Sequence, residues 1–211
     1  QNAYARAWLD NLPDKATFAA ELDHILNAPV TIYSEFRAAG GALFALRKQP
    51  KEEQASRVVM PDPEHAEAAQ VVFAPITAEH PRRSRDWYGP SPDGTKVAFE
   101  MTANSSRGLG LMRTDGDATI ETLIPVANME HAYTPSWSPD GKTIAFSWWR
   151  HGGRRDIYLL DVATRALTQV TDDRAYDLEP RYSPDVKWLY FVSDRTGVYN
   201  LYAYEFATQK V

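Results

Sequence analysis

The hydrophobic residues of positions 1–29 recur at helical spacing. Trp8 and Leu12 lie four residues apart, and a second apolar stripe runs from Phe18 to Leu26. This spacing places apolar side chains along one face of a helix. The pattern predicts an N-terminal segment of two helices over these positions.

Two prolines set the expected limits of the second helix. Proline is favoured in the first helical turn, and an acidic residue such as Asp14 after Pro13 suits the positive end of the helix dipole. A residue that precedes proline is pushed out of the helical region. We therefore expect the helix to end at Ala28, before Pro29.

From Thr31 onward the hydrophobic pattern changes to short apolar runs that are broken by turn residues. Gly40-Gly41 is expected to form a tight turn, and the polar stretch from Pro61 to Ala69 is expected to form a loop. The first strands are expected over residues 32–37, 42–48, 55–60 and 71–73.

The most specific pattern in the chain is an internal repeat. The run Ser-Pro-Asp-Gly begins at residues 91 and 138, and it returns at residue 183 with Val186 in the place of glycine. The copies are 47 and 45 residues apart, and a period of about 40–50 residues is typical of a β-propeller with one blade per repeat. The candidate turn residues are Ser91, Pro92, Asp93, Gly94, Ser138, Pro139, Asp140, Gly141, Ser183, Pro184 and Asp185.

Each residue type of this repeat suits a tight turn between two strands. Proline sets φ at about −65°, the aspartate side chain bonds to nearby backbone, and glycine accepts a positive φ. A positive φ is costly for a β-branched residue such as Val186. The third turn is therefore expected to differ from the other two or to be strained.

The predicted fold class is all-β: a β-propeller over residues 30–211 behind the helical segment 1–29. Propellers have roughly 4–8 blades. The pattern of the last blade breaks off at Val211, so we expect the chain to be part of a larger ring. About four blades are expected, over residues 30–75, 84–126, 131–172 and 177–211.

The composition suits a soluble β-rich protein and excludes several kinds of site. Aromatic residues make up 12% of the chain, as strands favour, and the net charge of −5 gives no basic patch for nucleic acid. The chain has no cysteine, so disulfides, thiolate metal sites and cysteine nucleophiles are excluded. No apolar run has the length of a membrane span. We expect a soluble protein of the cytoplasm or the periplasm.

The sequence offers no arrangement for nucleophilic catalysis. The Gly-x-Ser-x-Gly motif of a strand-to-helix nucleophile is absent. Ser105 and Ser106 are interpreted as part of the turn between the second and third strands of a blade. No catalytic residue is therefore assigned.

The histidines and aspartates indicate no metal site, and no cofactor is expected. His24 is placed on a helix, and the other four histidines, His65, His80, His131 and His151, are placed in loops without metal-ligand spacing. The single aspartate of each repeat turn does not match the closely spaced oxygen ligands of a calcium loop.

Two local features are candidates for contacts. His151 precedes the segment 152–155, Gly-Gly-Arg-Arg, which is interpreted as a flexible basic loop and a candidate partner contact. Trp148 and Trp149 end a predicted strand. Because adjacent strand residues face opposite sides of a sheet, one of them is expected in the core and the other near an interface.

Residues 1–100 resemble the start of a prolyl oligopeptidase-family serine peptidase. The segments that carry this resemblance are Gln1–Asp10 with Leu12-Pro13, Ile25–Pro29, Phe36–Gly41 with Leu43-Phe44, and Asp86–Gly94. The resemblance implies a seven-bladed propeller that filters substrates by size, an α/β-hydrolase domain with a Ser, Asp and His triad, and N-terminal helices that pack on that domain. None of the triad positions lies in this chain.

Residues 130–211 resemble the repeats of TolB-like propellers. The segments that carry this resemblance are Asp177–Asp185 and Tyr190–Gly197. Similar blades occur in the dipeptidyl-peptidase and acylaminoacyl-peptidase branches of the same peptidase superfamily. This resemblance implies the type of propeller rather than its function.

Two functions are consistent with these resemblances. The first is a non-catalytic part of a bacterial-type prolyl oligopeptidase, in which the propeller gates substrate access to a hydrolase domain absent from this chain. The alternative is a TolB-like interaction module with no enzymatic activity. The expected partners are the α/β-hydrolase domain of the same longer polypeptide, or a peptide substrate.

Self-association is a further expectation, because the end blades of a partial ring leave apolar faces uncovered. The residues expected near one end are Tyr33, Phe36, Phe44 and Phe73, and those expected near the other are Trp188, Tyr190, Phe191, Tyr199 and Tyr202.

Overall fold

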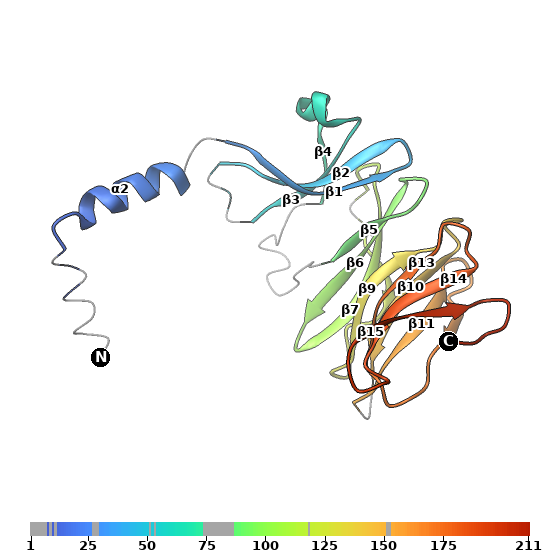
Figure 1. The fold of residues 1–211 in the computed structure, drawn as a ribbon. Helices are drawn as coiled ribbons and strands as arrows, with labels where there is room; N and C mark the ends of the chain where they lie inside the picture. Colours follow the sequence, from blue (N-terminus) through green and yellow to red (C-terminus); the bar gives the residue numbers. More distant parts are fainter. Residues whose placement is uncertain are drawn as a thin grey trace.

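The structure is a computed structural model, and it describes residues 8, 10, 12–26, 30–50, 52, 54–73, 87–117, 119–150 and 153–211. Most of the predicted first helix, and the predicted helix end at Ala28, lie outside the described residues. The strands form sheets that follow one another along the chain (Figure 1).

Helix α2 (Lys15–Leu26) begins where the sequence places proline and aspartate. The backbone N–H of Phe18 donates to the carbonyl oxygen of Asp14 at 2.9 Å, which closes the first turn. The helix lies apart from the sheets (Figure 1). Its apolar side chains are exposed, with Phe18 at 64% and Ile25 at 69%.

The first blade is a four-stranded antiparallel sheet in which each strand pairs with the next. Its strands are β1 (Ile32–Ala39), β2 (Ala42–Lys48), β3 (Ser56–Met60) and β4 (Gln70–Phe73). Gly40-Gly41 forms the turn between β1 and β2, as predicted. The strands fall where the apolar runs place them.

The connection between β3 and β4 corrects one prediction. The stretch from Pro61 to Ala69 was expected to be a loop, but it contains the 3-10 helix η1 (Pro63–Ala68). Asp62 caps this helix, because its Oδ1 accepts a hydrogen bond from the backbone N–H of His65 at 2.9 Å. Proline at the first helical position adds to the same signal.

The next three blades follow the repeat. The second holds β5 (Tyr88–Pro90), β6 (Lys96–Ala103), β7 (Ser106–Arg113) and β8 (Glu121–Ile124). The third holds β9 (His131–Trp137), β10 (Thr143–Trp149), β11 (Arg155–Asp161) and β12 (Leu167–Gln169). The fourth holds β13 (Asp177–Tyr182), β14 (Trp188–Ser193) and β15 (Asn200–Glu205). The predicted fold class, a β-propeller behind a short helix, is confirmed.

The blades pack face to face through alternating side chains. In β10, Phe146 packs on the second blade, whereas its neighbour Ala145 packs on the fourth. This alternation follows from the strand period of two. The blade is therefore buried on both faces, and its strand reads as a nearly continuous apolar run.

One phenylalanine per repeat packs on the preceding blade. Phe99, Phe146 and Phe191 lie eight residues after their repeat serines, and all three are fully buried. Burial of such a side chain contributes about 1.5–3 kcal/mol. The regular position of these residues gives each seam the same central contact.

The expected exposure of the end blades is corrected at two positions. Phe44 and Phe191 were expected near uncovered ends, but both are buried in seams between blades. The opposite face of the fourth blade carries the exposed residues, among them Tyr190 and Leu201, the latter at 71%. The prediction failed because the face of the blade on which a side chain lies depends on the register of its strand, and not on whether the strand is near an end of the chain.

The turn Gly40-Gly41 lies against the repeat turn of the second blade. The backbone N–H of Gly40 donates to the carbonyl oxygen of Pro92 at 2.9 Å. A Cβ at Gly40 would lie 2.1 Å from the carbonyl oxygen of Asp93. Only glycine leaves room for this approach of two backbones.

The third repeat turn has the same backbone geometry as the other two. Val186 has φ of +59°, close to +71° at Gly94 and +70° at Gly141. The backbone N–H of Val186 donates to the carbonyl oxygen of Ser183 at 3.0 Å, as the two glycines do to their own serines. Valine is therefore held in a conformation that is strained for a β-branched residue.

We predict that Val186→Gly raises the free energy of unfolding by about 1 kcal/mol, because it relieves this strain. Urea denaturation of the purified chain measures the change. The reverse substitution Gly141→Val is the matched control: a Cβ there meets only Pro92 Cδ, at 3.8 Å, so it should destabilise through φ alone. A lowered midpoint for Val186→Gly would contradict the prediction.

Candidate binding site on the innermost strands

The predicted turn residues use their side chains within their own turns. In each turn the serine hydroxyl donates to the aspartate two residues later. The distances are 2.5 Å for Ser91 and Asp93, 2.6 Å for Ser138 and Asp140, and 2.7 Å for Ser183 and Asp185. Each serine Oγ also accepts from the backbone N–H five residues on, as Lys96 illustrates at 3.0 Å.

These bonds hold the pKa of the turn aspartates below its usual value, first through the serine hydroxyl and then through a backbone N–H. The remaining turn residues shape the backbone: Pro92, Pro139 and Pro184 stand at the second position, and Gly94 and Gly141 take positive φ. The turns therefore stabilise hairpins.

The serines of the second blade lie partly as expected. Ser105, with φ of +57°, belongs to the turn between β6 and β7. Ser106 instead begins β7 and is buried, and its Oγ accepts a hydrogen bond from the backbone N–H of Met129 at 3.0 Å. The assignment of Ser106 to the turn was wrong, because its hydroxyl secures the loop before the next blade.

The structure corrects two of the histidine placements. His131 begins β9 rather than lying in a loop, and its ring contacts Tyr133 and Trp149 at centroid distances of 5.7 Å and 5.1 Å. Burial lowers the pKa of His131, and nearby arginines lower it further. His65 lies in η1 instead of a loop.

One further histidine lies in the described part of the chain. His24 lies on α2, as predicted. His80 and His151 lie outside the described residues. Among the described residues, no three histidine, aspartate or glutamate side chains are grouped as a metal site requires.

The structure differs from the prediction for the basic loop and agrees with the prediction that one tryptophan of the pair lies in the core. Arg155 was expected in a flexible loop, but it begins β11, where its Nε donates to Ser147 Oγ at 2.8 Å. Arg154 forms an exposed ion pair with Asp172 at 3.2 Å. Trp148 is buried in a seam and Trp149 is half-buried beside His131, as the strand alternation predicts.

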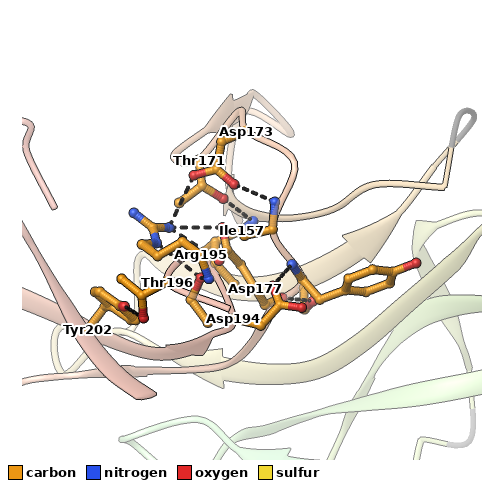
Figure 2. A network of polar contacts seen from close by, with 12 residues as sticks. Ile157, Thr171, Asp173, Asp177, Asp194, Arg195, Thr196 and Tyr202 are labelled. Carbon is orange, nitrogen blue, oxygen red and sulfur yellow. Dashed lines mark hydrogen bonds and ion pairs between the residues drawn. The ribbon is translucent and has the colours of Figure 1, made fainter. Parts of the chain in front are cut away.

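A polar network joins the third and fourth blades (Figure 2). Arg195 reaches the buried carboxylate of Asp177 at 3.2 Å and the partly exposed carboxylate of Asp173 at 3.4 Å. Its guanidinium also lies over the rings of Phe191 and Tyr202, at 5.2 Å and 4.9 Å from their centroids. Arg195 therefore pairs with two carboxylates of this seam and stabilises the contact between blades.

Asp156 is the exception in this network. It is 5% exposed, and its Oδ1 has no hydrogen-bond partner among the described residues. Burial raises the pKa of Asp156 to about 6, and the charges of Asp177, Asp172 and Asp173 add to the rise. Ionisation of this carboxyl is unfavourable in the folded protein.

The innermost strands of the four blades form a different kind of surface. Strands β1, β5, β9 and β13 follow one another side by side and line a hollow of about 640 Å³. Much of its wall is aromatic or proline. The residues that define it are Phe36, Arg37, Trp87, Pro135, Trp137 and Arg181.

Two arginines from distant blades meet in this hollow. Arg37 of β1 and Arg181 of β13 both lie over Trp87, with their Cζ atoms 5.0 Å and 5.1 Å from the ring centroid. Tyr88 supports the first of them, since its ring centroid lies 5.6 Å from Arg37 Cζ. We call Arg37, Trp87 and Arg181 the arginine pair site.

A β-bulge precedes each arginine. Glu35 and Glu179 take positive φ, +53° and +52°, at the points where β1 and β13 shift register. A bulge bends its strand and re-aims the residues beside it. Arg37 and Arg181 each stand two residues after the bulge, so the same device directs both toward Trp87.

The arginine pair site was not predicted from the sequence. A signal was available: the segments Glu35-Phe36-Arg37 and Glu179-Pro180-Arg181 share the pattern Glu-x-Arg on the first strand of a blade. The pattern alone does not indicate that the two segments approach each other.

Comparison with known protein families assigns the chain to a family. The family model described as the TolB β-propeller domain matches residues 90–211, more than half of the chain. The chain belongs to the TolB β-propeller family. The matched TolB segment holds the three Ser-Pro-Asp repeats, from Ser91 onward, and most of the three blades in which they lie.

Two curated relatives match the same part of the sequence. An uncharacterized protein of Agrobacterium fabrum is 34% identical over 112 residues, which cover 52% of this chain and 36% of that protein. The Tol-Pal system protein TolB of Francisella tularensis is 30% identical over 114 residues, which cover 50% of this chain and 26% of that protein. The chain thus matches about a third or less of each relative's length.

Solved structures share the fold at low sequence identity. Prolyl oligopeptidase B from Galerina marginata matches with a TM-score of 0.70 at 15% identity, over 96% of this chain and 33% of that one. TolB from Acinetobacter baumannii matches with a TM-score of 0.57 at 22% identity, over 85% of this chain and 39% of that one. The expected resemblance to both kinds of propeller is confirmed at the level of the fold. No helix of the described residues is long and apolar enough to cross a membrane.

We predict that Asp156→Asn stabilises the protein at pH 8 by about 1–2 kcal/mol and has little effect at pH 4. The pKa of Asp156 is raised to about 6 in the folded state. The contribution of its protonated carboxyl to the free energy of unfolding is therefore complete below pH 4 and is lost as the pH rises through 6. Asparagine removes that loss.

Urea denaturation at both pH values measures the effect. Asp185→Asn is the control, because the pKa of Asp185 is lowered in the folded state and its substitution should destabilise at pH 8 instead. A stability difference between wild type and Asp156→Asn that does not change with pH would contradict the prediction.

Proposed function

We propose that this chain is the non-catalytic helical and propeller part of a prolyl oligopeptidase-type serine peptidase. In this proposal the propeller controls the passage of peptide substrates to an α/β-hydrolase domain outside this sequence. The bond-breaking chemistry then belongs to that domain, and the hollow on the innermost strands contacts the passing peptide.

The exposed apolar side chains of α2 are the observation that carries this proposal. Phe18 and Ile25 are both more than half exposed, and exposed apolar surfaces of this kind usually mark an interface. The similarity to the Galerina peptidase covers 96% of the chain, whereas that to the Acinetobacter TolB covers 85%. A hydrolase domain is a partner that would bury this helix.

The hollow suits the second part of the proposal. Its volume of about 640 Å³ lies within the range of sites that hold small ligands or short peptide segments. Phe36, Pro135 and Trp137 offer apolar surface, and the arginine pair site adds polarity. These features favour contact with an extended polypeptide.

A TolB-like interaction module is the second candidate, and the family match over residues 90–211 favours it. In that function the same hollow would bind a segment of a partner protein, without hydrolysis. Peptide turnover therefore distinguishes the two candidates.

We expect the polypeptide encoded by the complete gene to hydrolyse short proline-containing fluorogenic peptides, and to leave the same sequence intact within a long folded protein. A serine-directed inhibitor should abolish this activity. The present chain alone should show no inhibitor-sensitive turnover, since its sequence has no nucleophile motif. Absence of turnover by the complete polypeptide would contradict the proposal and favour the interaction module.

The role of α2 has its own test in the complete polypeptide. Ile25→Asp should lower the melting temperature or the peptidase activity, because a charge would enter the interface with the hydrolase domain. Glu21→Gln, on the same helix, is the matched control and should change neither. Equal behaviour of the two variants would contradict the docking of α2.

A further inference from the structure

We propose that the arginine pair site binds a carboxylate group of a polypeptide that occupies the hollow. The carboxylate is either the C-terminus of the peptide or an acidic side chain. This inference rests on the proposed peptide-binding role of the hollow, and it adds the chemical class that the hollow selects.

Two positive charges converge on one aromatic ring. Arg37 and Arg181 come from the first and fourth blades and lie at nearly equal distances from Trp87, 5.0 Å and 5.1 Å. Contact with an aromatic face stabilises a guanidinium and fixes its plane. Trp87 therefore holds both groups in place before a ligand arrives.

The charges of Arg37 and Arg181 lie close enough to repel each other. Burial lowers the pKa of Arg181, Glu179 raises it, and the charge of Arg37 lowers it further. Within the described ranges, neither arginine forms an ion pair with a carboxylate, and the buried Nε of Arg37 has no hydrogen-bond partner. A bound anion would remove the repulsion and satisfy free donors.

The shape of the guanidinium groups favours a carboxylate as the bound anion. A guanidinium presents a planar fork that matches a carboxylate. Arg181 uses one Nη to donate to the carbonyl oxygen of Pro180 at 2.8 Å and keeps its other donors for a ligand. Phe36 and Pro135 add apolar surface beside the pair. A peptide carries a carboxylate beside apolar side chains, so it can contact both the arginines and this apolar surface.

Matched peptides test the chemistry on the unmodified protein. Calorimetry would compare acetyl-Ala-Ala-Pro-Ala as the free acid and as the amide, and an internal Glu peptide with its Gln counterpart, both amidated. We expect the carboxylate member of at least one pair to bind about tenfold more tightly, a preference that high salt weakens. The pair that discriminates identifies the source of the carboxylate.

Substitutions then locate the effect. Arg37→Met and Arg181→Met should each abolish the carboxylate preference while leaving amide binding in place, and Arg181→Lys should restore part of it. Arg113→Met is the matched control, because Arg113 is an exposed arginine at the end of β7 that pairs with Asp115. Circular dichroism melting verifies that each variant is folded.

The outcomes separate this inference from the proposed function. Equal binding of the members of both pairs to the unmodified protein would overturn the carboxylate site, whether or not any variant folds. Equal but measurable binding would leave the peptide-binding role standing. A preference that survives both methionine substitutions would overturn the assignment to Arg37 and Arg181.

Discussion

The packing of one blade face on the next is the interaction on which the rest of this structure depends. Phe99, Phe146 and Phe191 occupy the same position of successive repeats, and each is buried against the preceding blade. Because a strand buries alternate side chains on its two faces, every inner blade requires neighbours on both sides. The packing in these seams sets the angles between blades, and therefore the positions of the side chains that line the hollow.

Much of the fold could be predicted from the sequence because its signals are local. The period of the repeat, the apolar runs and the Gly40-Gly41 turn all act over a few residues. Helix η1 was missed although Asp62 and Pro63 gave a capping signal of the same kind. The face on which Phe191 lies was also missed, because it depends on strand register and on which blade comes next.

The candidate site could not be predicted in this way. Arg37 and Arg181 are far apart in the sequence, and their approach depends on how strongly the blades curve around the central hollow. Local features of each arginine, such as the bulge before it, say nothing about that curvature. By contrast, the residues of the repeat turns were found easily, and they act on the hairpins rather than on a ligand.

The distance between the two guanidinium groups over Trp87 also depends on the curvature of the propeller. Arg37 belongs to the first blade and Arg181 to the fourth, so the distance between them depends on the angles of the three seams between these blades. A small rotation at any seam changes that gap, although the residues of the seam do not touch it. The affinity of the arginine pair site for its ligand would then depend on how tightly the blades pack in seams far from the site. Mutations that change the stability of the seams would also change ligand binding.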